Sequence, residues 1–377
     1  MANGDDNAQT VPRIYILFPT LLGPVPRWHE RLPAIAEMGF DWIFLNPVHL
    51  PGASGSLYAI KDTRRLHPLL LGPEADAGVD APTEPGSNAG SDSGSGTGPG
   101  EGDSLLRDFC SAAADAGIRV MVDLVINHSA RDGVLVARHP EWFAKDRNGD
   151  IRPPSVADLG DPEQVTVWED LAELDYRERP ERAAIIEHWQ ALISRYLSIG
   201  FAGFRCDAAY KLPGAVWQQL IDSARAQRAD RRFFAETLGA PEDEIEQLRG
   251  AGFDYQFNSA KWWDFREDWL LEQYRSFRGL APSIAFPESH DTPRLAAETN
   301  GSARESRFRY LSRLPLFGTP GERKSLTCRW WDGKGRHYRA TCARRVSVAE
   351  EILGGGCGGS AKRNWSRRIC CSGSGWV

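Results

Sequence analysis

An arginine and a carboxylate stand two positions apart at the end of an apolar run. Residues 201–204 read FAGF and lead into Arg205 and Asp207, which is the pattern of a short buried strand with charged side chains at its carboxyl end. Residues i and i+2 of a strand lie on one side of a sheet, so Arg205 and Asp207 can face the same cleft. A structural ion pair at a strand end is the alternative interpretation.

A second carboxylate follows another apolar run. Glu236 comes directly after residues 233–235, which read FFA. Cleavage of a glycosidic bond with retention of configuration needs two carboxyl groups about 5 Å apart, an ionised nucleophile and a protonated acid. Arg205 would favour the ionised form of Asp207, while the apolar approach to Glu236 would raise the pKa of that carboxyl group. The alternative for Glu236 is an ordinary structural or exposed acid.

Two further strand-like runs end in polar residues of suitable chemistry. Residues 120–128 read VMVDLVINH and end at His128, while residues 284–291 read IAFPESHD and end at His290 and Asp291. Four such runs in one chain favour a shared active site over four unrelated polar clusters.

These runs belong to a regular alternation of strands and helices. The expected strands are Ile14–Phe18, Trp42–Leu45, Arg119–Ile126, Phe201–Asp207, Phe233–Thr237, Phe253–Phe257 and Ser283–Phe286. The expected helices are Pro26–Met38, Leu105–Ala116, Glu181–Ile199, Pro213–Arg228, Pro241–Arg249, Trp262–Phe277 and one that begins at Arg304. Seven alternations with polar residues at the strand carboxyl ends predict an α/β fold, a (β/α)8 TIM barrel more than a doubly wound sheet. The sequence after Leu314 has no pattern of an eighth strand and helix, so we expect this unit to be missing or non-native.

Composition divides the chain into unequal parts. We expect a disordered start over residues 1–13 and a catalytic barrel over 14–313, with a small inserted subdomain at 129–180. Seven of the seventeen residues from Gly86 to Gly102 are glycine, so residues 72–103 are predicted to form a flexible loop. Residues 314–377 hold twelve Lys and Arg against four Asp and Glu, and five of the seven cysteines. This tail is predicted to be non-native or disordered, with a basic cysteine-rich module as the alternative.

Taken together, the four runs resemble the signature motifs of the α-amylase superfamily, glycoside hydrolase family 13. Residues 123–128 (DLVINH), residues 203–207 (GFRCD), Glu236 and residues 289–291 (SHD) follow the order of the family's motifs on its (β/α)8 barrel. The resemblance covers about Ile14 to Leu314.

The resemblance implies specific roles. Asp207 would be the nucleophile, Glu236 the acid/base, and Asp291 the third carboxylate, which binds sugar hydroxyl groups. Asp123 would position Arg205. The implied substrate-binding residues are Tyr58 by stacking, His128 and His290 by hydrogen bonding, and Arg205 through Asp207. Lys211, a cation beside the expected cleft, is a further candidate for substrate binding. Without the resemblance, His128 would be interpreted as a histidine at a strand end with its hydrogen bonds made inside the protein, and Tyr58 as an ordinary aromatic residue of the core.

Two positions depart from the family pattern. Ser289 stands where the family usually has asparagine. Lys211 stands where many amylases have a histidine that binds calcium together with the counterpart of Asn127, and a lysine there would repel Ca²⁺. We therefore expect no metal ligand and no cofactor, with calcium disfavoured. The tryptophans that suit outer sugar subsites, or equally the buried face of a helix, are Trp217, Trp262 and Trp263.

The implied function is that of a retaining α-glycosidase, which acts on α-1,4-glucans or malto-oligosaccharides through a covalent glycosyl-enzyme intermediate. An α-glucan transglycosylase similar to the maltosyltransferases is the alternative, and Lys211 could then meet an anionic leaving group. A third possibility is an inactive, incomplete glucan-binding barrel.

The composition also bears on partners and location. A net charge of −6 gives no sign of a basic surface that would bind nucleic acid. The polar start and the lack of eighteen consecutive apolar residues predict a cytoplasmic protein without a membrane partner.

Overall fold

The computed structural model describes residues 12–72, 99–157, 163–263, 268–313, 326–331 and 337–342. The chain divides into two compact units, Met1–Gly318 and Thr319–Val377. In the described part of the second unit, β14 (Leu326–Trp331) and β15 (His337–Cys342) pair in antiparallel orientation. The remainder of the predicted tail, the predicted disordered start up to residue 11, and residues 73–98 of the predicted loop lie outside the described residues.

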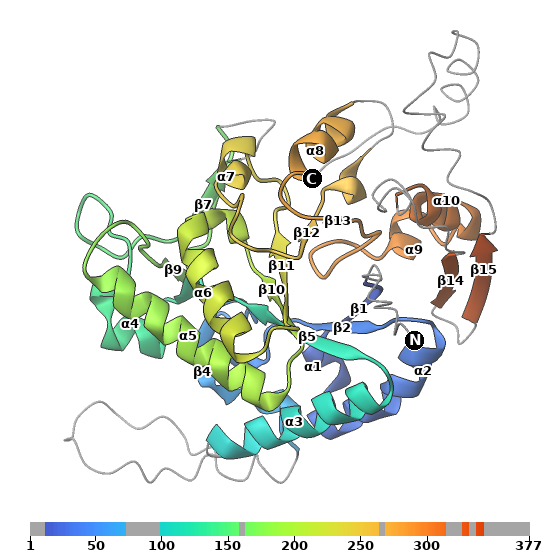
Figure 1. The fold of residues 1–377 in the computed structure, drawn as a ribbon, viewed down its shortest axis with the longest axis horizontal. Helices are drawn as coiled ribbons and strands as arrows, with labels where there is room; N and C mark the ends of the chain where they lie inside the picture. The colour runs from blue at the N-terminus through green and yellow to red at the C-terminus, as the bar shows by residue number, and fades with distance from the viewer. Residues whose placement is uncertain are drawn as a thin grey trace, which may run out of the picture. The chain divides into compact units, whose positions relative to one another are not determined.

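A curled parallel sheet of seven strands forms the centre of the first unit (Figure 1). Its order is β1-β2-β5-β10-β11-β12-β13, and every neighbouring pair is parallel. The strands are β1 (Ile14–Leu17), β2 (Trp42–Leu45), β5 (Arg119–Leu124), β10 (Gly203–Cys206), β11 (Arg232–Glu236), β12 (Tyr255–Phe257) and β13 (Ser283–Ile284). Parallel neighbours bring their carboxyl ends to one edge of the sheet, where the polar motifs follow.

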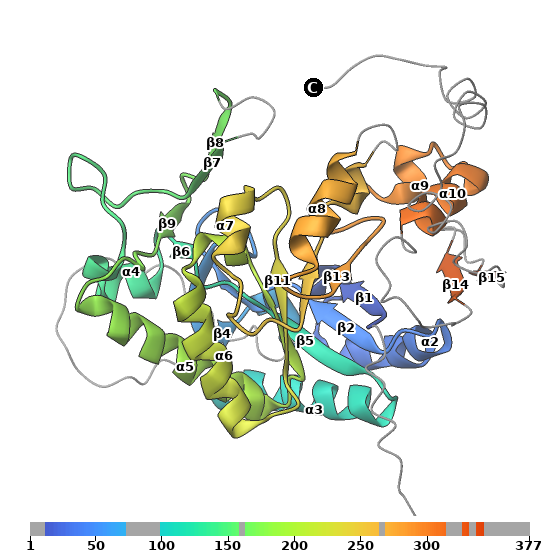
Figure 2. The same cartoon turned by 45° about the horizontal axis from the view of Figure 1, so that its top comes forward.

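Helices connect these strands and cover the outer face of the sheet. Figures 1 and 2 show α3, α5 and α6 along this face. The helices of the connections are α1 (Pro19–Leu22), η1 (Val25–Arg31), α2 (Leu32–Glu37), α3 (Pro99–Asp115), α5 (Glu181–Ile199), α6 (Gly214–Gln227), α7 (Glu242–Glu246) and α8 (Trp269–Phe277). α9 (Leu295–Glu298) and α10 (Ala303–Arg313) follow the last strand of the sheet.

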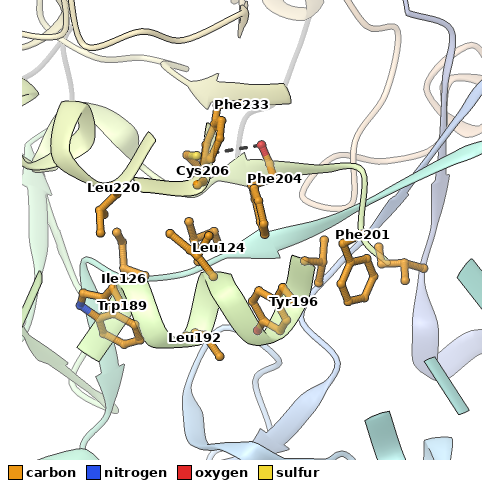
Figure 3. Close-up of a cluster of buried hydrophobic side chains, with 14 of the residues drawn as sticks. Leu124, Ile126, Trp189, Leu192, Tyr196, Phe201, Phe204, Cys206, Leu220 and Phe233 are labelled. Carbon is orange, nitrogen blue, oxygen red and sulfur yellow. Dashed lines mark hydrogen bonds between the residues drawn. The ribbon is translucent and has the colours of Figure 1, made fainter. Parts of the chain in front are cut away.

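Alternation along the strands separates an outer core from an inner one. Phe204 and Phe233 belong to the larger outer core, where the ring of Phe204 meets Tyr196 of α5, whereas Phe44 and Phe234 belong to a smaller cluster on the inner face. Figure 3 shows the outer core, in which the strands meet the buried stripe of α5. The side chains labelled there are Leu124, Ile126, Trp189, Leu192, Tyr196, Phe201, Phe204, Cys206, Leu220 and Phe233. Because Phe204 faces outward, the next residue, Arg205, faces inward.

Short elements lie beside the carboxyl edge of the sheet. β3 (His49–Pro51) pairs with β4 (Ile60–Leu66), and the single-turn helix η2 (Pro68–Leu70) follows. After β5, the segment predicted as an insertion contains β6 (His128–Ala130), α4 (Val134–Arg138), η4 (Pro140–Trp142), β7 (Ser155–Ala157), β8 (Val165–Val167) and β9 (Leu171–Glu173). β6 pairs with β9 and β7 with β8, both antiparallel.

The last part of the predicted flexible loop is helical. α3 begins at Pro99, although we predicted loop as far as residue 103 and a helix only from Leu105. Asp103 on the first turns of α3 accepts from Nε and Nη2 of Arg195 on α5, at 2.9 and 2.5 Å. This pairing between two helices stabilises the glycine-containing turn, which composition alone does not predict.

No helix among the described residues combines the length and apolar character needed to cross a lipid bilayer.

Candidate active site

The site centres on Arg205, whose guanidinium contacts three carboxylates. Nη1 donates to Oδ1 and Oδ2 of Asp123, at 2.9 and 3.1 Å, and to Oδ1 of Asp207 at 2.6 Å. Nη2 lies 3.2 Å from Oε2 of Glu236. Arg205 is only 4% exposed, so its guanidinium can form few hydrogen bonds with water. A buried guanidinium requires such partners, because taking an ion out of water costs several kcal/mol.

Strand register explains how these groups meet. Arg205 on β10 stands opposite Asp123 on β5 and opposite Phe234 on β11. All three side chains share the inner face, and Glu236, two residues beyond Phe234, continues that face to the strand end. The central arginine is therefore flanked by one acidic residue on each neighbouring strand.

Glu236 also contacts the backbone that follows Asp207. Its Oε2 accepts the N–H of Ala208 at 2.7 Å. Ala208 has a left-handed backbone with φ of +39°, which turns the chain from β10 into the single-turn helix η5 (Ala209–Lys211). The turn after the predicted nucleophile thus holds the predicted acid.

The motif after β13 reaches across the inner face of the sheet. Nε2 of His290 lies 3.0 Å from Oδ2 of Asp291 and 2.7 Å from the hydroxyl oxygen of Tyr58. The ring of His290 is stacked on Tyr58, with centroids 5.2 Å apart, and meets Phe44 of β2 edge-on at 6.3 Å. His290 therefore joins the segment after the last strand of the sheet to residues at the other side of it.

Tyr58 links the remaining predicted residues. Its hydroxyl donates to Oδ2 of Asp123 at 2.6 Å, and its backbone carbonyl accepts from Nε2 of His128 at 3.1 Å. The guanidinium of Arg205 lies 5.8 Å from the centre of its ring. Seven of the eight predicted site residues are thereby connected by direct contacts, with Asp123 as a shared member. They are Tyr58, His128, Arg205, Asp207, Glu236, His290 and Asp291.

Burial and neighbouring charges set the protonation of the acidic groups. Burial raises the pKa of Asp123 to about 7, although the charge of Arg205 acts against it. Burial likewise raises the pKa of Glu236, against Arg205 and with the help of the Asp207 charge, which is the direction expected from its apolar approach. For Asp291, burial acts upward, but the hydrogen bond and charge of His290 outweigh it and lower the pKa. The site thus contains an acid suited to hold a proton and a carboxylate suited to remain charged.

Lys211 takes part in a different contact. Its Nζ donates to Oε2 of Glu244 on α7 at 3.2 Å, and lies 5.0 Å from the centre of the Tyr210 ring. The side chain is 34% exposed, so ligand and Glu244 would compete for the ammonium group. The prediction that Lys211 binds substrate stays a prediction.

The described residues do not fit the calcium site that the resemblance implies. The side-chain oxygen of Asn127 is buried without a hydrogen-bond partner in the described chain, as a ligand atom would be. However, Lys211 occupies the expected histidine position and carries a positive charge. Within the described ranges, no cluster of three or more His, Cys, Asp or Glu side chains could hold a metal ion.

Two contacts of the site were not predicted from the sequence. In one, the N–H of Ala208 donates to Oε2 of Glu236. In the other, Nδ2 of Asn46 donates to the hydroxyl oxygen of Tyr58 at 3.0 Å. A signal for Asn46 was available, because it is a polar residue at the carboxyl end of the second strand. The three tryptophans considered for sugar subsites differ in exposure: Trp217 is fully buried and Trp263 is 9% exposed, whereas Trp262 is 50% exposed.

Sequence comparison finds similarity to enzymes that are named for their action on α-glucans. The family model of the glucanotransferase domain of glycogen debranching enzyme matches residues 12–147. An α-1,4-glucan:maltose-1-phosphate maltosyltransferase of Burkholderia pseudomallei is 28% identical over 295 residues, which are 78% of this chain and 23% of that protein. An α-amylase of Haloarcula japonica is 26% identical over 59% of this chain and 35% of its own length.

Solved structures agree with the sequence matches. An α-amylase from Lactobacillus plantarum superposes with a TM-score of 0.54 and 21% identity, over 76% of this chain and 64% of that one. The resemblance to the α-amylase superfamily is confirmed. A trehalose-6-phosphate hydrolase of Bacillus licheniformis gives a TM-score of 0.57 at 14% identity, over 81% of this chain and 62% of the other. With these neighbours, the seven-stranded curled sheet is a partial (β/α)8 barrel, as predicted.

The matched region is only a part of each relative's length. The chain spans about a quarter of the Burkholderia maltosyltransferase and about a third of the Haloarcula amylase. These relatives act on α-glucans or related sugars according to their names.

Proposed function

We propose that this chain carries the catalytic site of a retaining enzyme that cleaves α-1,4-glucosidic bonds in glucans or malto-oligosaccharides. The observation that supports the proposal best is the shared guanidinium: Arg205 contacts Asp207 at 2.6 Å and Glu236 at 3.2 Å. Retaining cleavage needs two carboxyl groups close together, and a single arginine that touches both keeps them close.

The chemistry assigns a distinct role to each carboxyl group. Asp207 attacks the anomeric carbon and forms a covalent glycosyl-enzyme, while Glu236 donates its proton to the departing glycosidic oxygen. Glu236 then takes a proton from the acceptor hydroxyl group or water as its oxygen bonds to the anomeric carbon, and the bond between the sugar and Asp207 breaks to restore the free carboxylate. Asp291, with a lowered pKa, remains anionic and accepts hydrogen bonds from sugar hydroxyl groups. His128 and His290 hydrogen-bond the same sugar, and the ring of Tyr58 stacks on it.

The acceptor distinguishes hydrolysis from transfer. Water as the acceptor gives a glycosidase, which is the first candidate and agrees with amylases among the relatives. Transfer of a maltosyl group is the second candidate, and it is favoured by several relatives named as maltosyltransferases that use maltose 1-phosphate. In that reaction phosphate would be the leaving group, and Lys211 would be a cation available to it. The cytoplasmic location expected from the sequence remains a prediction.

Product analysis separates the candidates. The 377-residue protein is incubated with maltoheptaose, with and without phosphate, and with maltose 1-phosphate plus maltoheptaose. Shorter malto-oligosaccharides and no dependence on phosphate support hydrolysis, whereas chain extension by two glucose units, or phosphorolysis, supports maltosyl transfer. Glucan binding without turnover in all three mixtures would leave the inactive binding barrel.

A mechanism-based label tests the nucleophile directly. A fluorinated glycosyl fluoride, which forms the intermediate but slows its breakdown, should attach to Asp207 and be found there by peptide mapping. Asp207→Asn should abolish labelling, while Asp222→Asn, which changes an exposed acid on α6, should leave it intact. Attachment to another carboxylate would disprove the proposed assignment.

A further inference from the structure

Three polar groups converge on the hydroxyl oxygen of Tyr58. Oδ2 of Asp123 lies at 2.6 Å, Nε2 of His290 at 2.7 Å and Nδ2 of Asn46 at 3.0 Å. They come from three separate parts of the sheet: Asp123 is on β5, Asn46 directly follows β2, and His290 lies beyond β13. A phenol hydroxyl group has one proton to donate and two lone pairs to accept with, so three partners saturate it.

The proton of this hydroxyl has a preferred direction. Burial raises the pKa of Tyr58 well above its ordinary value, so the phenol keeps its proton. The contact to Oδ2 of Asp123 is the shortest of the three, and the same oxygen also accepts from Nη1 of Arg205 at 3.1 Å, so Oδ2 is an acceptor toward Tyr58. Tyr58 therefore donates to Asp123, and both Asn46 and His290 must donate to Tyr58.

The environment of Asn46 is consistent with this assignment. Asn46 is fully buried, and its Oδ1 has no hydrogen-bond partner among the described residues. Turning the amide around would place Oδ1 against an oxygen whose proton already serves Asp123, and would lose the hydrogen bond. His290 correspondingly has its proton on Nε2, the atom that also faces Asp291, while its Nδ1 has no partner in the described chain.

We propose that Asn46 is a positioning residue: by donating to the Tyr58 hydroxyl group, it directs the hydroxyl proton to Asp123 and leaves Tyr58 to accept from His290. Asp123 then remains an acceptor for both Tyr58 and Arg205. The hydroxyl group of Tyr58 is fully used within the protein. The effect on catalysis rests on the proposed function, whereas the hydrogen-bond pattern itself does not.

Proton NMR of the folded protein tests the pattern without any substrate. A buried hydroxyl donating to a carboxylate should give a downfield, slowly exchanging resonance, which Tyr58→Phe assigns by its disappearance. Asn46→Leu removes the donor, and Asn46→Asp replaces it with an acceptor of the same shape. Asn258→Leu is the matched control, because Asn258 is also buried at a strand end and donates to a hydroxyl oxygen, that of Ser283 at 3.2 Å.

The expected result is an upfield shift or faster exchange of this resonance in both Asn46 variants and no change in the Asn258 variant. Either Asn46 variant suffices if the other does not fold. An unchanged resonance in a folded Asn46 variant would overturn the proposal. For an active protein, we expect kcat/KM to fall about tenfold in Asn46→Leu, mostly through kcat, as for the loss of one hydrogen bond that matters in the transition state. If no variant or wild-type protein turns over glucan but the resonance responds as expected, the proposed function fails and this inference stands.

Discussion

Ala208 donates its backbone N–H to Oε2 of Glu236 at 2.7 Å, from the residue that directly follows Asp207. The contact from Nη2 of Arg205 also falls on Oε2. Both contacts favour negative character on that oxygen, so a proton on Glu236 belongs on Oε1. The orientation of the predicted acid is therefore set by the strand end that carries the predicted nucleophile.

Substitution of the two carboxylates should have effects that depend on the leaving group. Glu236→Gln removes the proton donor, so kcat/KM on maltoheptaose should fall by about 10²- to 10⁴-fold. Formation of the glycosyl-enzyme from maltosyl fluoride should be much less affected, because fluoride leaves with little help from an acid. Asp207→Asn should abolish turnover of both substrates. Steady-state and burst kinetics measure this contrast, and equal losses on both substrates in Glu236→Gln would exclude the acid role.

Replacing the central arginine should damage stability as well as activity. Arg205→Met leaves Asp123, Asp207 and Glu236 without their shared cation, and should lower the free energy of unfolding by about 3 to 5 kcal/mol. Denaturant unfolding followed by circular dichroism measures the loss. The matched control is Arg225→Met: Arg225 contacts Asp254 at 2.9 Å, but Arg232 still pairs with that carboxylate, so we expect a loss of about 1 kcal/mol or less. Comparable losses in the two variants would contradict the special role of Arg205.

Local sequence patterns predicted the regular elements well. Strand β2 (Trp42–Leu45) and helix α5 (Glu181–Ile199) have the predicted ends, and α5 stops where Gly200 takes a φ of +116°. The predicted helix Pro26–Met38 is divided instead into η1 and α2, because Pro33 lacks an N–H and can be accommodated only in the first turn of a new helix. Strand β13 has two residues where four were predicted, and it pairs with β12 alone among the described strands.

The site was predictable to the extent that its residues follow strands. Arg205, Asp207 and Glu236 could be placed together from strand order alone, since neighbouring strands end at one edge. The contacts of Asn46 and Ala208 depend on how a loop hydroxyl group and a backbone N–H are oriented in three dimensions, which no spacing along the chain specifies. Lys211 was predicted from its position after the nucleophile, but the sequence did not reveal that Glu244 on α7 would lie beside it.

The raised pKa of Asp123 should be visible in the pH dependence of stability. The pKa is about 7 in the folded protein against 3.8 for an ordinary Asp, so folding favours the neutral form. Its stabilising contribution is complete below about pH 4 and is lost as pH rises through about 7, by at most about 1.4 kcal/mol per pH unit. Asp123→Asn should therefore flatten the fall of the free energy of unfolding between pH 4 and 8.

The comparison with wild type is essential to that measurement, because other groups titrate in the same range. Glu236 has a raised pKa and contributes in the same direction, while His49, whose pKa burial lowers to about 4, contributes in the opposite one. Both are present in the two proteins and cancel in the difference. An identical pH slope for wild type and Asp123→Asn would show that Asp123 does not titrate in this window.

Chelators should leave the activity unchanged. Asp175 lies beside Asn127 in the structure, because the preceding residue, Leu174, donates its N–H to the Asn127 carbonyl. The carboxylate of Asp175 already accepts from Arg177 and Arg179, at 2.6 and 2.9 Å. These arginines hold the pKa of Asp175 at about 2, so a cation would have to displace them. Activity and melting temperature measured after dialysis against EDTA, with and without added Ca²⁺, test this expectation. Loss of activity that Ca²⁺ restores would contradict it.

The ion pair between Lys211 and Glu244 gives a test of the transferase alternative. Both side chains are about one-third exposed, so the pair contributes little to stability, and Glu244→Gln should change the melting temperature only slightly. If Lys211 meets a phosphate group, freeing it in Glu244→Gln should lower KM for maltose 1-phosphate several-fold, and Lys211→Met should raise it. KM for maltoheptaose hydrolysis should be the same in all three proteins. Parallel changes of KM for both substrates would instead mean that the lysine shapes the cleft without recognising phosphate.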